Sequence, residues 1–261
     1  MSKDIISFDS LLEVANKIPG SHINRELFLR SELKLYCTPE ELEIAVKECP
    51  AKAGIKRKLI NPIAKSCIEY ERKKATALSF VSGLPGGLAI LGTIPADAMQ
   101  VFVTMLRTVQ KLAYLYGFPE FFKEGENVDS YSKDLILTMI GVMYGIQEVC
   151  NGLTKYAATF ASQIGKNIAK QALTKTAWYP ALKKLLRLVG IQLTKELFGR
   201  TVAKAIPLLS GAVCGFLTYK TFGVMARNLQ EALKESPTAS VKYFKKKKDG
   251  NVIDAEFSED V

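Results

Sequence analysis

A chain of 261 residues can bury a sizeable hydrophobic core, and its formal net charge of +10 favours an anionic partner. Hydrophobic residues make up 48 % of the sequence, which is high for a water-soluble protein and low for a polytopic transporter. The five cysteines lie far apart without a CxxC pair, and His22 is the only histidine, so the usual zinc patterns are excluded. We therefore expect reduced thiols that pack as small core residues, no metal site and no cofactor.

Residues 1–54 predict a small N-terminal helical subdomain in which the charges are balanced. Amphipathic helices are expected over residues 4–18 and 22–36, with His22 at the surface. The segment 50–54, which contains a proline and a glycine, predicts a boundary. The first residues lack the apolar run of a signal peptide, so we expect a cytoplasmic protein.

A capping pattern predicts a third helix in this subdomain. Thr38 is its N-cap, Pro39 occupies the first helical position, and Glu41 completes a capping box.

The segment Ala75–Ala96 has no charged residue and is long enough to cross a bilayer if it is wholly helical. Glycines and prolines interrupt it, at Gly83, Pro85–Gly87 and Pro95, so one continuous helix is not expected. We predict a broken, glycine-rich apolar hairpin that is buried in the protein core or partly in lipid. Its side chains that would contact a membrane are Leu84, Leu88, Ile90 and Leu91.

A helix restarts at Pro95, and Asp97 lies in its first turn. The predicted apolar face consists of Phe102, Met105, Leu106, Val109, Leu112, Ala113 and Tyr116. The other side carries Asp97, Gln100, Thr104, Arg107 and Lys111. Further helices are expected over residues 135–153, 155–175, 178–197 and 200–234, followed by a basic and polar tail, residues 236–261.

Small residues recur at a spacing of four in three of these helices, where they would let another helix approach closely. They are Gly141 and Gly145, the series Ala157, Ala161, Gly165 and Ala169, and Gly211 with Gly215; Gly83 and Gly87 have the same spacing in the hairpin. Such ridges are equally typical of a membrane protein and of a tightly packed soluble core.

The helix that starts near Trp178 and Tyr179 is basic and amphipathic. Its apolar stripe is Leu182, Leu185, Leu186, Val189, Leu193 and Leu197, and its charges include Lys183, Lys184 and Arg187. This composition is typical of a helix that lies in a membrane interface, with the aromatic residues at the boundary. A core helix with a solvated cationic face is the alternative.

Positive charge is concentrated around this helix, because residues 155–204 contain ten lysines and arginines and a single acidic residue, Glu196. An anionic membrane surface is the expected partner. Nucleic acid is disfavoured because no recognition motif is present.

Asp97 is the one weak candidate for a catalytic residue, since it adjoins the apolar hairpin and shares a helix face with Arg107 and Lys111. A carboxylate that caps its own helix is the favoured interpretation.

Three stretches of the sequence resemble the EcsC protein family. They are residues 71–87, from Glu71 through the Gly-Leu-Pro-Gly-Gly motif; residues 93–117, from Thr-Ile-Pro-Ala-Asp97 to Leu-Ala-Tyr-Leu-Tyr-Gly117; and residues 205–215, Ala-Ile-Pro-Leu-Leu-Ser-Gly-Ala-Val-Cys-Gly. The similarity covers about residues 55–235. The family takes its name from a protein encoded beside an ABC transporter, so the resemblance implies a bacterial helical protein at or near the membrane. It supplies no catalytic residue. The family's later segment often carries more glycine than this chain has after Gly215.

The predicted fold is all-α: a close-packed helical bundle (residues 55–235) built round the broken hairpin, with the N-terminal subdomain and the tail at its ends.

The predicted function is that of a membrane-associated accessory protein, peripheral or partly inserted at the inner face of the cell membrane. By family analogy it would be linked to transport, secretion or envelope stress and could contact a membrane transporter. The alternatives are an enzyme that uses Asp97 in an apolar cavity, and a soluble helical scaffold that binds a protein or nucleic acid.

Overall fold

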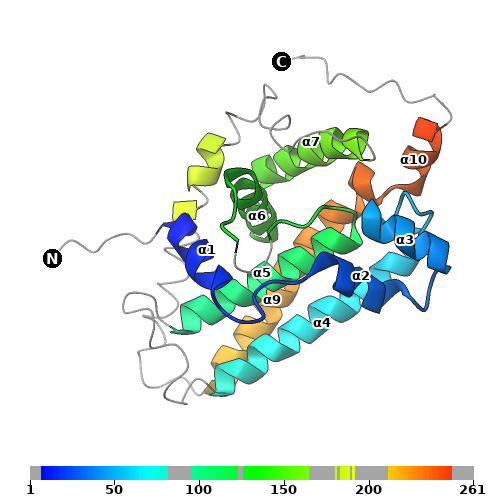
Figure 1. Cartoon of the computed structure of the whole chain (residues 1–261). Coiled ribbons are helices and arrows are strands. Elements are labelled where there is room, and N and C mark those ends of the chain that lie inside the picture. The colour runs from blue at the N-terminus through cyan, green and yellow to red at the C-terminus, as the bar shows by residue number, and fades with distance from the viewer. Residues whose placement is uncertain are drawn as a thin grey trace.

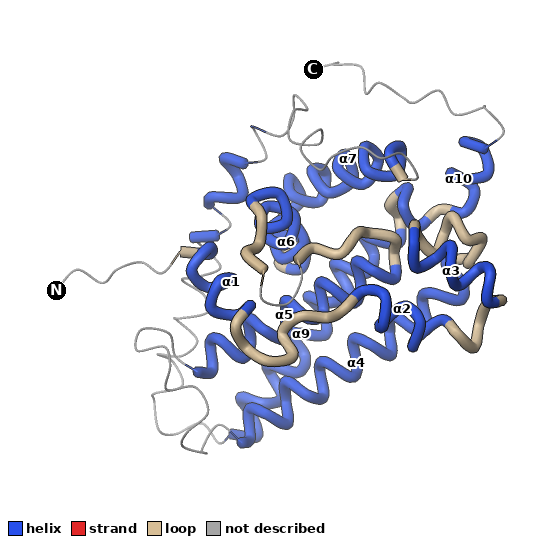
Figure 2. The backbone as a smooth tube through the Cα atoms, viewed as in Figure 1, coloured by secondary structure: helices blue, strands red, loops and turns tan. Residues whose placement is uncertain are grey.

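The computed structural model describes residues 7–81, 96–122, 126–164, 180, 183–188, 190–191 and 211–248. Over these residues the chain is helical and contains no strand, which confirms the all-α prediction (Figure 2). The elements in chain order are α1 (Phe8–Asn16), α2 (Arg25–Leu33), α3 (Pro39–Lys47), α4 (Arg57–Val81), α5 (Ala96–Leu115), α6 (Ser130–Met143), α7 (Gln147–Gln163), α9 (Gly211–Lys234), the 3₁₀ helix η2 (Pro237–Ala239) and α10 (Val241–Lys248).

Helix α5 is the centre of the molecule, because it contacts α1, α2, α4, α6 and α9. Helices α4, α5 and α9 lie side by side, and α6 and α7 pack above them in the view of Figure 1. The predicted apolar face of α5 is confirmed, since every one of its residues from Phe102 to Tyr116 is buried.

The opposite side of α5 is buried or half-buried, so its polar groups find partners inside the protein. Gln110 is fully buried; its amide donates to Ser21 O over 2.8 Å and accepts from the Ile23 backbone N–H over 2.9 Å. The Tyr116 hydroxyl donates to Asn61 of α4 over 2.9 Å and accepts from Gln230 of α9 over 3.2 Å. Burial raises the pKa of Tyr116 to about 12. These bonds connect α5 to the loop before α2 and to both flanking helices.

Arg25, which the sequence did not single out, joins the N-terminal helices to the loop after α5. Its side chain is buried and donates to Phe118 O over 3.0 Å and to Glu48 O over 3.0 Å, and also to Val46 O. The last two carbonyls lie at the C-terminal end of α3, where a cation is favoured by the helix dipole. Desolvation lowers the pKa of the guanidinium below its usual value.

The predicted start of α3 is confirmed. Thr38 caps the helix by accepting from the Glu41 N–H over 3.2 Å, and the Glu41 side chain accepts from the Thr38 N–H over 3.0 Å. The boundary predicted at residues 50–54 stays a prediction; helices on both sides of it share one hydrophobic core that includes Leu11, Leu29 and Leu106.

The single helix predicted over residues 135–153 is wrong, because α6 ends at Met143 and α7 begins at Gln147. Gly145 lies between them with φ +77° and is exposed. The Ile146 N–H bonds to Gly141 O over 3.2 Å and the Gly145 N–H to Val142 O over 2.9 Å, which is a Schellman motif. Gly141 is buried in α6, but Gly145 ends that helix and does not form a packing ridge with it.

The tail predicted from residue 236 is partly wrong, since it contains η2 and α10. Phe244 of α10 is buried in a small core with Cys49, Ala51, Ala161 and Ile164. Lys247 donates to Ala161 O and Ser162 O at the end of α7. This contact places a lysine where a helix C-terminus favours positive charge.

Several predictions fall outside the described residues and stay predictions. These are the hairpin with Gly83, Leu84, Gly87, Leu88, Ile90 and Leu91, the aromatic residues Trp178 and Tyr179, Gly165 and Ala169, and the end of the tail from residue 249. Gly211 and Gly215 lie in α9, and Ala157 and Ala161 are buried in α7.

Gly117 and Gly54 offer a matched test of close packing, because both have a positive φ, +95° and +90°. A Cβ at Gly117 would meet Thr238 O at 2.7 Å, whereas a Cβ at Gly54 has nothing within 4 Å. We expect Gly54→Ala to lower the free energy of unfolding by about 1 kcal/mol through backbone strain alone. Gly117→Ala should lower it by about 3 kcal/mol, because the backbone of η2 must move as well. Urea denaturation measures both, and equal losses would show that the Gly117 contact adds nothing.

Candidate membrane-contact site

The part of the basic helix that the structure describes, residues 183–188 and 190–191, is helical and is called the basic segment below. Its inner side faces α1 and α6. Leu186 is 1 % exposed, and a Cβ at Gly190 would lie 3.4 Å from Phe8 Cβ and 3.6 Å from Leu137 Cδ2. Leu185 is partly buried against the same core. Of the predicted apolar stripe, the two described residues, Leu185 and Leu186, therefore pack against the protein.

The outer side of the basic segment carries the three cations of the prediction. Lys183, Lys184 and Arg187 are all exposed. They share this side with two apolar residues that the sequence analysis missed, Leu188 at 64 % and Ile191 at 40 % exposed. A helical wheel places the five side chains on one continuous arc, because residues three and four apart lie on one face. The exposed arc thus combines positive charge with apolar surface.

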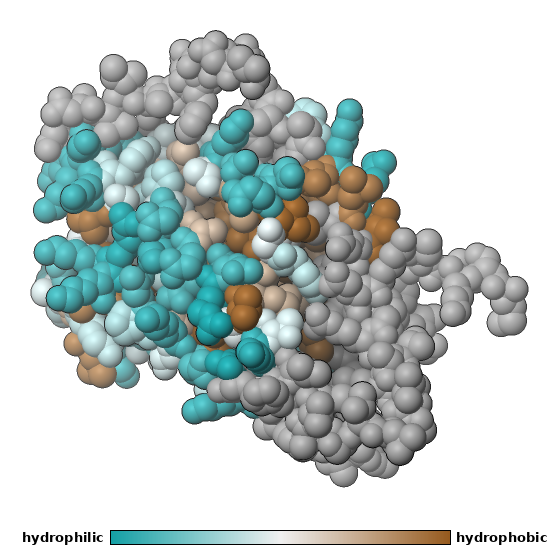
Figure 3. All heavy atoms as spheres, turned by 180° about the vertical axis from the view of Figure 1, so that it is seen from behind, coloured by the Kyte–Doolittle hydropathy of each residue, from teal (hydrophilic) through white to brown (hydrophobic). Residues whose placement is uncertain are grey.

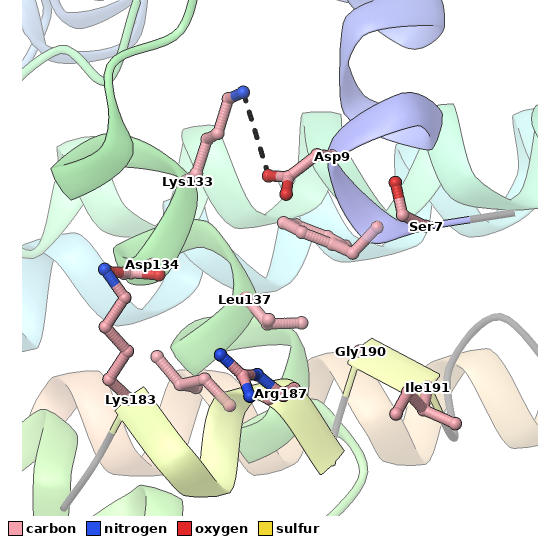
Figure 4. A pocket seen from close by; sticks show the side chains of 11 residues that line it. Ser7, Asp9, Lys133, Asp134, Leu137, Lys183, Arg187, Gly190 and Ile191 are labelled. Atoms are coloured by element: carbon pink, nitrogen blue, oxygen red, sulfur yellow. Dashed lines mark ion pairs between the residues drawn. The ribbon is translucent and has the colours of Figure 1, made fainter. Parts of the chain in front are cut away.

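A pocket of about 330 Å³ opens beside these residues, between α1, α6 and the basic segment (Figure 4). Its apolar lining comes from Phe8, Leu137, Leu186 and Ile191. Its charged lining comes from Asp9, Lys133, Asp134, Lys183 and Arg187. Lys183 and Arg187 were predicted from the sequence as membrane-contact residues. The pocket residues of α1 and α6 could not be, because they approach these two cations only in the fold.

Lys133, one of the described cations that line the pocket, pairs with two carboxylates of α1. Lys133 Nζ lies 3.7 Å from Asp9 Oδ1 and 3.3 Å from Glu13 Oε1, both of α1. These pairs fasten the start of α6 to α1. Lys183 and Arg187 extend from the other wall of the pocket, which the basic segment forms (Figure 4).

Helix α10 provides a second basic surface, since Lys242, Lys245, Lys246 and Lys248 are exposed. Figure 3 shows, from behind, that hydrophilic side chains cover much of the described surface and leave small hydrophobic patches between them. Within the described residues, no helix has both the length and the apolar character needed to span a bilayer.

The two basic residues that the catalytic hypothesis placed beside Asp97 pair with a different carboxylate. Asp97 lies in the first turn of α5, and its side chain is outside the described set. Arg107 and Lys111, which share its predicted face, both bind Glu71 of α4 instead. Glu71 is fully buried, with Arg107 Nη2 at 3.0 Å and Lys111 Nζ at 2.7 Å from its Oε1.

These two cations stabilise the negative charge of Glu71. Burial raises its pKa, but the bonds from Arg107 and Lys111 outweigh burial and leave the pKa below the usual value of 4.5. Arg107 also donates to Gly20 O, and the Lys111 ammonium lies 4.7 Å from the centre of the Tyr70 ring. A carboxylate enclosed by two cations stays ionised at neutral pH, which suits a structural ion pair better than a proton-transfer group.

The described cysteines and His22 form no nucleophilic site. Burial raises the pKa of Cys49 to about 11 and that of Cys67 to about 12, so both remain thiols at neutral pH. The prediction of a surface position for His22 is wrong. Its side chain is 10 % exposed, with Nε2 at 3.4 Å from Glu120 Oε1 and the ring 5.5 Å from that of Phe122, because the loop before α2 packs over the loop after α5. Among the described residues no group of three or more metal-ligating side chains is found.

Comparison of the chain with protein-family models, with curated proteins and with solved structures finds no match.

We expect Glu71→Gln to lower the free energy of unfolding by about 3 kcal/mol at pH 7, because it leaves Arg107 and Lys111 buried without a carboxylate. The pKa of Glu71 is lowered on folding, so its contribution is present above about pH 4.5 and is lost as the pH falls through the folded pKa. The difference between wild type and variant should therefore shrink below pH 4.5. Urea denaturation at several pH values measures it.

Glu69→Gln is the matched control, because Glu69 lies on the same helix with a side chain 45 % exposed. It should have little effect at any pH. A Glu71→Gln variant as stable as wild type at pH 7 would contradict the role of the buried carboxylate.

Proposed function

We propose that this protein is a membrane-associated accessory protein that attaches to an anionic bilayer through the outer face of the basic segment. The observation that carries the proposal is the arc on which Lys183, Lys184 and Arg187 flank the exposed Leu188 and Ile191. Contact with nucleic acid phosphates would use only the cations of this arc and would leave Leu188 and Ile191 without a role. In a bilayer interface both kinds of side chain are satisfied.

The strength of this attachment follows from general magnitudes. Three basic side chains near an anionic leaflet contribute about 3 kcal/mol. Burial of two partly exposed aliphatic side chains adds about 2 kcal/mol. The total approaches that of a single myristoyl chain, with a binding constant on the order of 10⁴ M⁻¹, which is reversible.

A stable attachment therefore requires a second contact. The exposed lysines of α10 supply one candidate, and the apolar hairpin with Leu84, Leu88, Ile90 and Leu91 supplies another. Trp178 and Tyr179 would extend the interfacial face at the start of the basic helix. The resemblance of residues 55–235 to the EcsC family supports a bacterial protein that acts at the inner face of the cell membrane, in transport, secretion or envelope stress.

Charge reversal at Lys183, Lys184 and Arg187, each to Glu, should abolish flotation of the protein with vesicles that contain anionic lipid. The matched control reverses Lys56, directly before α4, and Lys58 and Lys65 of α4. All three are exposed, and their reversal lowers the net charge by the same amount. The control should float like wild type. A second variant, Leu188→Ser with Ile191→Ser, should weaken flotation while the charges remain.

If both triple variants float equally, the basic segment is not the attachment surface, and a soluble scaffold is the better interpretation. Release of the wild type by high salt would indicate peripheral binding, whereas resistance to alkaline carbonate would indicate insertion of the hairpin.

A further inference from the structure

We propose that the pocket between α1, α6 and the basic segment binds the headgroup of one anionic glycerophospholipid, namely a phosphodiester that carries hydroxyl groups. This inference rests on the proposed function and names the ligand of the same surface. The phosphate would lie between Lys183 and Arg187, and the glycerol backbone would lie on the apolar lining.

The position of the cations supports a phosphate site. Lys183 and Arg187 are four residues apart, so both side chains leave the same side of the helix and line the pocket. Arginine and lysine side chains are the usual ligands of phosphate oxygens, and Arg187 can offer two parallel donors. Lys184 is exposed on the same helix but does not line the pocket.

The balance of charge selects the kind of phosphate. Among the described lining residues, the carboxylates Asp9 and Asp134 lie on the same pocket as the cations Lys183 and Arg187. A phosphodiester carries one negative charge, whereas a phosphomonoester at neutral pH carries nearly two and would be repelled more strongly by these carboxylates. Carboxylate oxygens accept hydrogen bonds, so Asp9 and Asp134 favour a headgroup with hydroxyl donors over one that offers only acceptors.

The apolar lining and the size of the pocket select a lipid over a free phosphate ester. Phe8, Leu137 and Leu186 are nearly buried and form the deeper surface, while Ile191 lies at the exposed side. A volume of about 330 Å³ is at the low end for ligand pockets. It accommodates a headgroup and the glycerol backbone, and the acyl chains would remain in the bilayer beside Leu188 and Ile191.

The test uses the full chain and dihexanoyl phosphatidylglycerol, kept below its micelle concentration, with binding measured by calorimetry. We expect Lys183→Gln and Arg187→Gln each to weaken binding at least tenfold, while Lys184→Gln, the matched control, changes it less than twofold. All three side chains are exposed, and the thermal unfolding midpoint checks that the variants fold. Ile191→Ser should weaken binding of the lipid but not of glycerol 1-phosphate, which lacks the apolar part.

Three outcomes would overturn the pocket. In the first, the three Gln variants lose affinity equally, which is the result expected of a diffuse cationic surface. In the second, dihexanoyl phosphatidic acid binds more tightly than the phosphodiester, which contradicts the proposed effect of the pocket carboxylates. In the third, glycerol 1-phosphate binds as well as the lipid, so that the site recognises a soluble phosphate ester.

Vesicle flotation of the same variants separates this inference from the proposed function. If the wild type floats but binds no short-chain lipid, membrane attachment stands and the pocket is not its site. If the wild type neither floats nor binds the short-chain lipid, both proposals fail.

Discussion

The structure depends on the burial of α5, in which no residue from Met99 to Leu115 is exposed. A helix that is covered on all sides must satisfy its polar side chains within the protein, since an unpaired buried group costs about 1–3 kcal/mol. Gln110 binds the backbone before α2, Arg107 and Lys111 bind Glu71 of α4, and Tyr116 bridges α4 and α9. These four residues therefore connect the central helix to the loop before α2, to α4 and to α9, and together they help to set the arrangement of the helices around it.

The same arrangement positions the proposed membrane surface. Phe8 of α1 packs edge-on against Phe102 of α5, with ring centroids 5.9 Å apart. Phe8 and Leu137 in turn form the surface on which Leu186 and Gly190 of the basic segment lie. The orientation of the basic segment is thus determined by residues that reach back to the central helix. Its charged arc faces outward because Leu185, Leu186 and Gly190 on the inner arc pack against the protein.

The sequence predicted what local chemistry decides. The capping box at Thr38 involves residues three apart, and the apolar face of α5 repeats within one helix, so both could be read directly. Contacts distant in the chain could not. Arg107 and Lys111 resemble a solvated face until Glu71 is placed beside them. The glycine pair at 141 and 145 fits a packing ridge and a helix stop equally well, and only the fold distinguishes them. The exposure of Leu188 was not predicted, because a helical wheel does not say which side of a helix will be covered. Helix α10 was not predicted either, because its packing depends on contacts of Phe244 with residues 49–51, which are distant in the chain.

The proposed attachment would combine two kinds of contact that have different effects. Diffuse attraction between basic side chains and an anionic leaflet weakens as salt rises and does not distinguish one anionic lipid from another. A pocket that contains both cations and carboxylates acts differently, because its opposite charges offset one another at long range while its geometry would select among headgroups. Lys184 and the lysines of α10 would then bring the protein to the surface, and Lys183 with Arg187 would determine which lipid holds it there. Two weak contacts of different kinds make the attachment reversible and selective at once, since neither alone is strong enough to retain the protein on the bilayer.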